Sequence, residues 1–268
     1  MKIVTIKLLK NIKYNFEFLN NIPKNIPIFL CLFILGFNTT FIGQSFKNSQ
    51  LANQKVASIY NKRIENIESI LESKGINLDQ LEVLLLGTKF EKKLNLYAKN
   101  KDDQEFILLK KYDFCKSSGH LGPKRKEWDG QIPEGIYYIN HFNPKSSYHL
   151  SLGINYPNKS DKILSAAKSL GNNIYIHGDC VTIGCIPLSD YWIEELYLFC
   201  LEARNNGQVQ IPVHIYPFEF DKMNDIDLDL DPFWMNLKEL YDHFMKNKTK
   251  LSIHVDEKGN YFFEDNGI

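Results

Sequence analysis

The stretch from residue 173 to residue 201 constrains the fold more than any other part of the sequence. Residues 173–176 (Asn-Ile-Tyr-Ile) are rich in β-formers and predict a strand that ends at His177. Ser189 is a typical helix N-cap, and apolar residues recur after it at helical spacing. The inner positions of this predicted helix are Ile193, Leu196, Cys200 and Leu201. Cys185 is therefore expected in a glycine-containing turn between a strand and a helix.

Such a turn is suited to a cysteine nucleophile. The backbone N–H groups of Gly184 and Cys185 are expected to converge on one point, as the oxyanion formed by attack on a carbonyl requires. Because a free thiol has a pKa of about 8.5, it needs a base, and His177 is the nearest candidate in the sequence. The carbonyl of Gly178 is expected to accept the other imidazole proton. Without a buried anion beside it, His177 should have a pKa near about 6.5 unless burial lowers it.

Four cysteines follow the N-terminal apolar segment, namely Cys115, Cys180, Cys185 and Cys200. An even count permits disulfides in an oxidising compartment, but the spacing does not decide which cysteines pair. A disulfide between Cys180 and Cys185 would remove the nucleophile. These two cysteines lack the C-x-x-C spacing of a redox motif, and with His177 they lack the second ligand pair of a zinc site. We therefore expect no metal and no cofactor.

The first 43 residues have the order of an export signal. Lysines precede the apolar run 26–37, and small and polar residues follow it. The segment 26–43 also approaches the length of about 18 residues that a membrane span requires, so a cleaved signal peptide and an uncleaved anchor both remain open. In either case we expect the rest of the chain to be exported to the periplasm or cell envelope. Association with a membrane is expected only through residues 24–43.

The remaining sequence predicts a helix, a sheet-rich body, a second helix and a hairpin. The first helix is expected at 48–74, and a helix capped by Asp231 precedes a hairpin at 251–263. Strands are expected at 81–89, 93–99, 105–115 and 136–140.

Charge and motif content exclude two classes of ligand. Lys+Arg and Asp+Glu both number 32, so the formal net charge is zero and no basic field is available for nucleic acid. The segment 119–124 (Gly-His-Leu-Gly-Pro-Lys) lacks the Gly-Lys-Ser/Thr ending of a phosphate-binding loop. We therefore expect neither nucleic-acid nor nucleotide binding.

The run IHGDCVTIGCIPLSD resembles the catalytic signature of the L,D-transpeptidase family, whose catalytic domain is of the YkuD type. In that signature a histidine followed by glycine or serine precedes Ser/Thr-x-Gly-Cys, which is here residues 182–185. DGQIPEGIYYI at 129–139 resembles the Thr-Pro-x-Gly motif of the family, and LGINYPNKSD at 152–161 resembles its Tyr/Phe-Pro-Asn segment. The resemblance covers about residues 80–218.

Two residues depart from the commoner family signature, Ser-His-Gly-Cys-Ile-Arg. Ile183 stands in place of its histidine, Pro187 stands in place of its arginine, and the loop after His177 is shorter. The chain is most similar to a divergent branch of exported relatives that share the HGDCV-T/S-IGC run. Because some of these relatives hydrolyse their substrate, the departures leave open whether amine or water accepts the acyl group.

The resemblance implies an α+β fold, with a β-rich catalytic domain of curled mixed sheets and flanking N- and C-terminal helices. Together with the residue patterns outside the resemblance, it divides the chain into a leader or anchor (1–43), a helical lead-in (44–79), the catalytic domain (80–218) and a C-terminal extension (219–268).

The implied partner is the stem peptide of peptidoglycan. Cys185 would attack a carbonyl between an L- and a D-centre, giving a thioester that an amine or water resolves, and Thr182 and Tyr156 would contact the substrate. A catalytically idle wall-binding module is the alternative. The joint presence of His177, Gly178, Gly184 and Cys185 argues against that alternative, because a binding module needs no thiolate.

Overall fold

The structure is a computed structural model that describes residues 45–222 and 231–264. The expected signal peptide or anchor at 1–43, and with it the expected membrane association through 24–43, lies outside the described residues. Within the described ranges, no helix is both long enough and apolar enough to cross a membrane.

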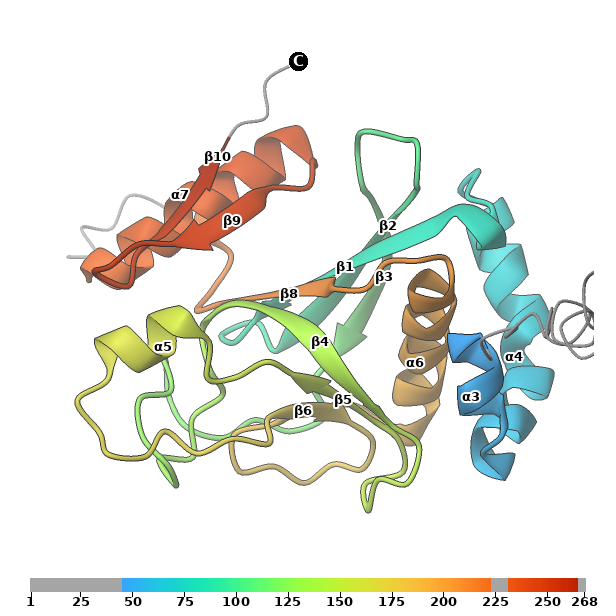
Figure 1. Ribbon diagram of the computed structural model, residues 1–268, viewed down its shortest axis with the longest axis horizontal. Coiled ribbons are helices and arrows are strands. Elements are labelled where there is room, and N and C mark those ends of the chain that lie inside the picture. Colours follow the sequence, from blue (N-terminus) through green and yellow to red (C-terminus); the bar gives the residue numbers. More distant parts are fainter. Residues whose placement is uncertain (1–44, 223–230, 265–268) are drawn as a thin grey trace, which may run out of the picture. The chain divides into compact units, whose positions relative to one another are not determined.

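The fold is built on a mixed, eight-stranded sheet with the order β3-β2-β1-β8-β4-β5-β6-β7 (Figure 1). Two neighbouring pairs, β1 with β8 and β6 with β7, are parallel, and the other pairs are antiparallel. The strands are β1 (Leu81–Thr88), β2 (Lys93–Asn100), β3 (Ile107–Asp113), β4 (Gly135–Asn143), β5 (Ser151–Ile154), β6 (Tyr175–His177), β7 (Ile186–Pro187) and β8 (Ile211–Tyr216). The predicted α+β class and the predicted strands are confirmed.

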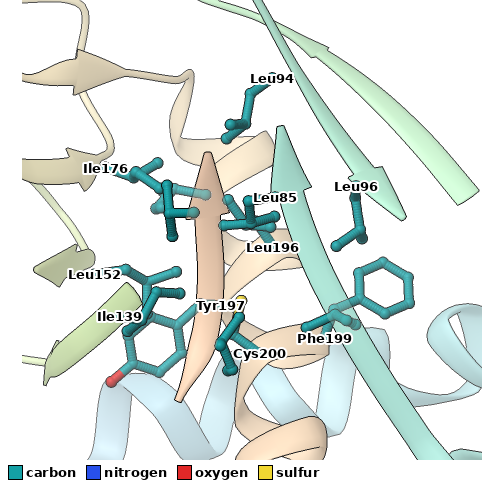
Figure 2. Packing of buried hydrophobic residues seen from close by; sticks show 14 of the residues in the cluster. Leu85, Leu94, Leu96, Ile139, Leu152, Ile176, Leu196, Tyr197, Phe199 and Cys200 are labelled. Atoms are coloured by element: carbon teal, nitrogen blue, oxygen red, sulfur yellow. The ribbon is translucent and has the colours of Figure 1, made fainter. Parts of the chain in front are cut away.

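Strand β1 lies between two hydrophobic clusters, which explains its nearly continuous apolar sequence. Because side chains alternate along a strand, Val83 and Leu85 enter one cluster while Leu84 and Leu86 enter the other. The first cluster is filled by helix α6 (Asp190–Asn205), as Figure 2 shows around Leu85. The second is filled by α7 (Pro232–Asn247).

The N-terminal part forms two helices, α3 (Phe46–Leu51) and α4 (Gln54–Glu72), so the prediction of one helix over 48–74 was wrong. The break has a local cause. The side chain of Asn53 accepts hydrogen bonds from the N–H groups of Lys55 and Val56, and this N-cap begins a new helix. Both helices pack against α6 (Figure 1).

The C-terminal elements follow the sequence pattern. The Asp231 side chain accepts a hydrogen bond from Phe233 N–H, and Pro232 occupies the first turn of α7. Strands β9 (Ser252–Val255) and β10 (Tyr261–Glu264) form the expected hairpin. The short helix α5 (Lys159–Leu164) and two 3-10 turns, η1 (Leu78–Gln80) and η2 (Phe220–Lys222), complete the described elements. The domain boundaries drawn from the sequence stay predictions.

A buried ion pair holds the irregular segment between β3 and β4. Lys89 Nζ lies 2.9 Å from Glu134 Oε1 and donates to the carbonyls of Gly122 and Ile132. The carboxylate of Glu134 also accepts hydrogen bonds from Gly122 N–H and the Trp234 indole. Burial lowers the pKa of the Lys89 ammonium, which the charge of Glu134 opposes. The charged pair therefore depends on the presence of both partners.

We predict that Glu134→Gln destabilises the protein by about 3 kcal/mol, because it leaves the Lys89 charge buried without its partner. The exposed pair of Lys93 and Asp113 provides the control, and Lys93→Met should cost less than about 1 kcal/mol. Urea unfolding of both variants measures the difference. Equal losses in the two variants would contradict the structural role of the buried pair.

Candidate active site

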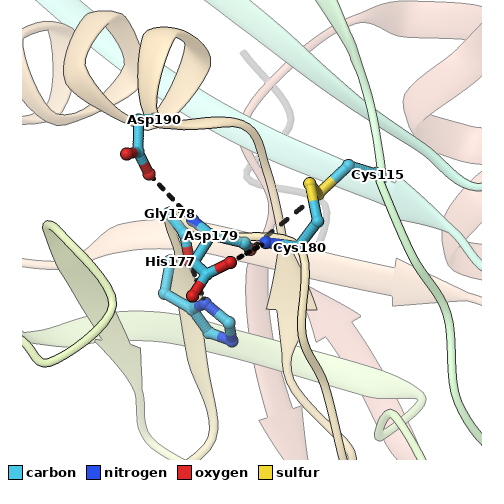
Figure 3. Close-up of a disulfide and its surroundings, with 6 residues drawn as sticks. All are labelled: Cys115, His177, Gly178, Asp179, Cys180 and Asp190. Carbon is cyan, nitrogen blue, oxygen red and sulfur yellow. Dashed lines mark hydrogen bonds between the residues drawn. A yellow bond between two sulfur atoms is a disulfide. The ribbon is translucent and has the colours of Figure 1, made fainter.

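The four cysteines among the described residues form one disulfide and two free thiols. Cys115, which follows β3, is bonded to Cys180, which lies in the loop after β6, with 5.5 Å between their Cα atoms (Figure 3). Cys185 and Cys200 are free, and Cys200 is buried among core residues. The pairing that the sequence left open is thus resolved. It leaves Cys185 with its thiol, and it removes Cys180 from any zinc site with His177.

The short parallel pair β6–β7 brings His177 and Cys185 to one place. Ile176 pairs with Ile186, and His177 pairs with Pro187. Cys185 immediately precedes β7, so alternation places its side chain on the same face of the pair as His177. Both residues line a cleft of about 620 Å³. The strand pairing therefore brings two residues that are eight positions apart in the sequence into one site.

His177 is oriented by its own neighbour. Its Nδ1 lies 2.6 Å from the carbonyl oxygen of Gly178, and Figure 3 shows this contact. A carbonyl oxygen only accepts, so Nδ1 carries the proton and Nε2 of the neutral ring is the acceptor. Burial lowers the pKa of His177, while the Gly178 carbonyl and the Asp179 charge oppose that change. The ring is therefore neutral at pH 7, and the expectation of a pKa near 6.5 is corrected downward.

Gly178 has room for no larger residue. A Cβ atom at this position would lie 2.6 Å from Asp190 Oδ1 and 2.9 Å from the Cβ of His149. Asp190 Oδ1 also accepts a hydrogen bond from Asp179 N–H at 2.9 Å (Figure 3). The start of α6 thus packs directly against the backbone that carries the histidine-orienting carbonyl.

Tyr148 covers the imidazole. Its ring centroid lies 4.8 Å from that of His177, with an interplanar angle of 33°. The next residue, His149, is bound through Nε2 to Glu194 Oε1 at 2.9 Å, and its carbonyl accepts from Lys55 Nζ at 2.8 Å. Helices α4 and α6 therefore hold the loop from which Tyr148 reaches the site. No sequence motif indicated this residue, because its partner lies 29 positions away.

The Cys185 thiol is protonated at rest. Burial raises its pKa, and the contact with the Tyr175 backbone and the charge of Lys124 oppose this only in part. Its Sγ lies 3.8 Å from the carbonyl oxygen of Asn173, toward which the thiol donates. With a neutral imidazole in the same cleft, the two groups rest as a thiol and an uncharged base, not as a thiolate–imidazolium ion pair.

The predicted oxyanion donors already have partners. Gly184 N–H donates to Ser118 Oγ at 2.8 Å, and Cys185 N–H donates to Thr182 Oγ1 at 2.9 Å. Hydroxyl groups from residues 66 and 3 positions away thus bind the two amides that were expected to converge on one point, and their role as oxyanion donors stays a prediction. Gly184 has a φ of +99°, and a Cβ there would lie 2.8 Å from the Gln131 carbonyl, so this turn requires glycine.

The two predicted substrate-contacting residues lie in different environments. Thr182 lines the cleft, and its hydroxyl donates to the Cys185 carbonyl at 2.7 Å. Tyr156 does not line the cleft, because its ring is buried in the core and its hydroxyl donates to the Leu170 carbonyl. Its expected contact with substrate is therefore wrong. The two residues that depart from the commoner signature also lie in different environments. Ile183 is exposed in the cleft, whereas Pro187 is buried in β7.

The L,D-transpeptidase catalytic domain model of the YkuD family matches residues 91–215. The chain is 35% identical over 175 residues to the Escherichia coli (strain K12) protein named "Putative L,D-transpeptidase YafK", and the match covers 62% of this chain and 68% of that protein. The same figures hold for YafK of Escherichia coli O157:H7. The chain therefore belongs to the L,D-transpeptidase family, as its sequence motifs predicted.

Solved structures show weaker similarity. The helical cell shape determining protein Pgp2 of Campylobacter jejuni is 19% identical with a TM-score of 0.41, over 66% of this chain and 74% of that chain. A point mutant of Pgp2 is 23% identical with the same TM-score, over 53% and 49% of the two chains. Bd1075 of Bdellovibrio bacteriovorus is 22% identical with a TM-score of 0.35, over 51% and 48%. The chain thus spans about half the length of two of these three structures.

We predict that Tyr148→Ala raises the pKa of His177 toward about 6.5, because removal of the Tyr148 ring exposes the imidazole and lets water stabilise its protonated form. In the unaltered protein the lowered pKa keeps the base neutral below pH 6.5, so any acidic limb of kcat/KM lies below that value. The variant should move this limb to higher pH. NMR titration of the imidazole and the pH profile measure both effects. Phe90→Ala, a change of an exposed ring outside the cleft, serves as the control, and an unmoved pKa in Tyr148→Ala would contradict the role of the ring.

Proposed function

We propose that this member of the L,D-transpeptidase family is a cysteine acyltransferase that acts on peptidoglycan stem peptides. The observation that carries the proposal is the single cleft that contains the free Cys185 thiol and a neutral His177 whose Nδ1 is held by a carbonyl. A nucleophile and an oriented base in one cleft are the requirements of covalent acyl transfer. A module that only binds the wall requires neither.

The proposed first step forms a thioester. His177 Nε2 takes the proton of Cys185 Sγ as the sulfur attacks the carbonyl carbon between an L- and a D-centre of the stem. The tetrahedral intermediate then breaks its C–N bond, and the departing amine takes the proton back from His177. In the second step an amine or a water molecule attacks the thioester while His177 again accepts the proton, the C–S bond breaks, and the departing Cys185 sulfur takes that proton back. An amine acceptor produces a crosslink, and water produces hydrolysis.

Stabilisation of the oxyanion requires a rearrangement of hydrogen bonds. The amide of Gly184 is bound to the Ser118 hydroxyl, and the amide of Cys185 is bound to Thr182. An oxyanion is a stronger acceptor than a neutral hydroxyl oxygen, so it would compete for these donors as negative charge develops. In the proposed mechanism Ser118 and Thr182 therefore hold the turn in the resting enzyme and yield the amides during reaction.

We predict that Cys185→Ala abolishes release of product from a disaccharide–tetrapeptide while the protein remains folded. The paired variant Cys115→Ala/Cys180→Ala should keep measurable turnover, because it removes only the link between β3 and the loop. Cys200→Ala, which alters a buried free thiol, controls for the loss of a cysteine. Mass spectrometry of muropeptides follows the reaction and identifies the acceptor. Full turnover by Cys185→Ala would refute the proposed nucleophile.

We also propose that the protein is exported to the periplasm or cell envelope, where its substrate lies. The lysine-flanked apolar run 26–37 supports this proposal. If residues 1–43 are a cleaved signal peptide, mature protein should begin near Gln44, which mass analysis of its N-terminus would detect. Intact protein that begins at Met1 and sediments with membranes would instead identify an anchor. Material that keeps Met1 and stays in the cytosolic fraction would contradict export.

A further inference from the structure

A second cleft adjoins the cleft that contains Cys185. It has a volume of about 290 Å³ and shares Asn173 and Ile183 with the first cleft. The carbonyl of Asn173 is also the group toward which the Cys185 thiol donates. Ile183 lines both clefts and is 75% exposed, so both clefts remain open to solvent beside it. A substrate bound at the thiol can therefore extend into the second cleft.

Trp128 forms one wall of this second cleft. Its side chain is 85% exposed, and within the described ranges its indole makes no hydrogen bond or ring contact. Its backbone lies in the left-handed region, with a φ of +62°. Such a conformation is uncommon for a bulky residue and persists only where surrounding contacts impose it. A large apolar side chain is thus held in water at the edge of the site.

The loop that presents Trp128 is fixed by hydrogen bonds on both sides of the indole. The Asp129 carboxylate accepts from the N–H groups of Arg125, Lys126 and Gln131. On the preceding side, Glu127 N–H donates to the carbonyl of Ser169 at 2.9 Å. The bond to Ser169 connects the loop to the segment on the opposite side of the cleft. The backbone that carries the exposed indole is therefore fixed, which lowers the ordering cost of a ligand that packs on the ring.

The other groups of the second cleft indicate what would bind there. The ammonium of Lys124 is paired with Asp129 at 2.6 Å, and the Glu127 carboxylate accepts from the Ser169 hydroxyl at 2.8 Å. The Lys124 charge is thus compensated by Asp129, whereas Glu127 is bound only to a hydroxyl and keeps its negative charge. The indole, this carboxylate and the exposed side-chain amides of Asn172 and Asn173 remain available, and the two amides make no hydrogen bond among the described residues.

This set of groups matches a sugar ring better than a charged peptide. The C–H groups on one face of a pyranose pack against an indole, while amides donate to and accept from its hydroxyl and acetamido groups. The carboxylates of a second stem peptide would find no free cation in this cleft, because Lys124 is paired with Asp129, whereas the Glu127 carboxylate can accept hydrogen bonds from sugar hydroxyls. The expected ligand is therefore neutral, ring-shaped and hydroxylated.

We propose that the Trp128 cleft binds a sugar of the glycan strand whose stem peptide is attacked at Cys185. This inference rests on the proposed function, since it assigns a second part of the same substrate. The cleft would select stem peptides that are still joined to their disaccharide, and Trp128 would determine that specificity. It takes no part in the bond-making steps.

Direct binding tests the sugar site without turnover. The full chain with Cys185→Ala and labelled indole nitrogens is titrated with the peptide-free disaccharide of N-acetylglucosamine and N-acetylmuramic acid, whose lactyl carboxyl group is converted to a neutral amide. The chain has three tryptophans, Trp128, Trp192 and Trp234, so three indole signals are expected. We expect the Trp128 signal alone to shift. Trp128→Ala in the same background should weaken binding about tenfold, and Trp128→Tyr should largely retain it.

A comparison of two substrates tests the specificity. With Cys185 intact, Trp128→Ala should lower kcat/KM about tenfold for the disaccharide–tetrapeptide and leave kcat/KM for the free tetrapeptide unchanged. Phe262→Ala changes an exposed ring in β10 that lines neither cleft and should alter neither value. An equal loss on both substrates, or an unshifted Trp128 signal, would overturn the inference. Sugar binding in a protein that processes neither substrate would support the cleft and reject the proposed function.

Discussion

The parallel pairing of β6 with the two-residue strand β7 is the interaction on which the candidate site depends. It aligns His177 with Pro187, and the Leu188 N–H donates to the His177 carbonyl at 2.7 Å. Since β7 is so short, these few bonds alone would hold the turn weakly. The disulfide from Cys115 to Cys180 and the hydrogen bond from Cys115 N–H to the Pro187 carbonyl connect the same region to β3. The site is thus stabilised from both sides.

Burial determines the chemical state of the two central residues. It raises the pKa of the Cys185 thiol and lowers the pKa of the His177 imidazole, because both charged forms lose hydration. The consequence is a resting pair without net charge. In the proposed mechanism, proton transfer therefore accompanies nucleophilic attack, so the orientation of Nε2 that Gly178 imposes matters more than a stable thiolate.

Segments outside the signature complete the site. The ion pair of Arg63 with Glu194 connects α4 to α6, and Glu194 also binds His149 beside the ring that covers His177. On the other side, Lys89 and Glu134 fix the irregular segment that precedes β4. The helices and loops that surround the sheet therefore contribute to the position of the base and to the shape of the cleft, in addition to the stability of the fold.

Local patterns in the sequence determined the strands, the capped helices and the contact between His177 and Gly178, because each of these depends on residues within a few positions of one another. The tertiary structure decided the rest. It paired Cys180 with Cys115, gave the Gly184 amide to Ser118, buried Tyr156 and placed Tyr148 over His177. The three pairs join residues 29 to 66 positions apart, and all of these residues except His177 lie in irregular segments. No periodicity records which loops meet, because their meeting depends on how the whole sheet and its helices pack.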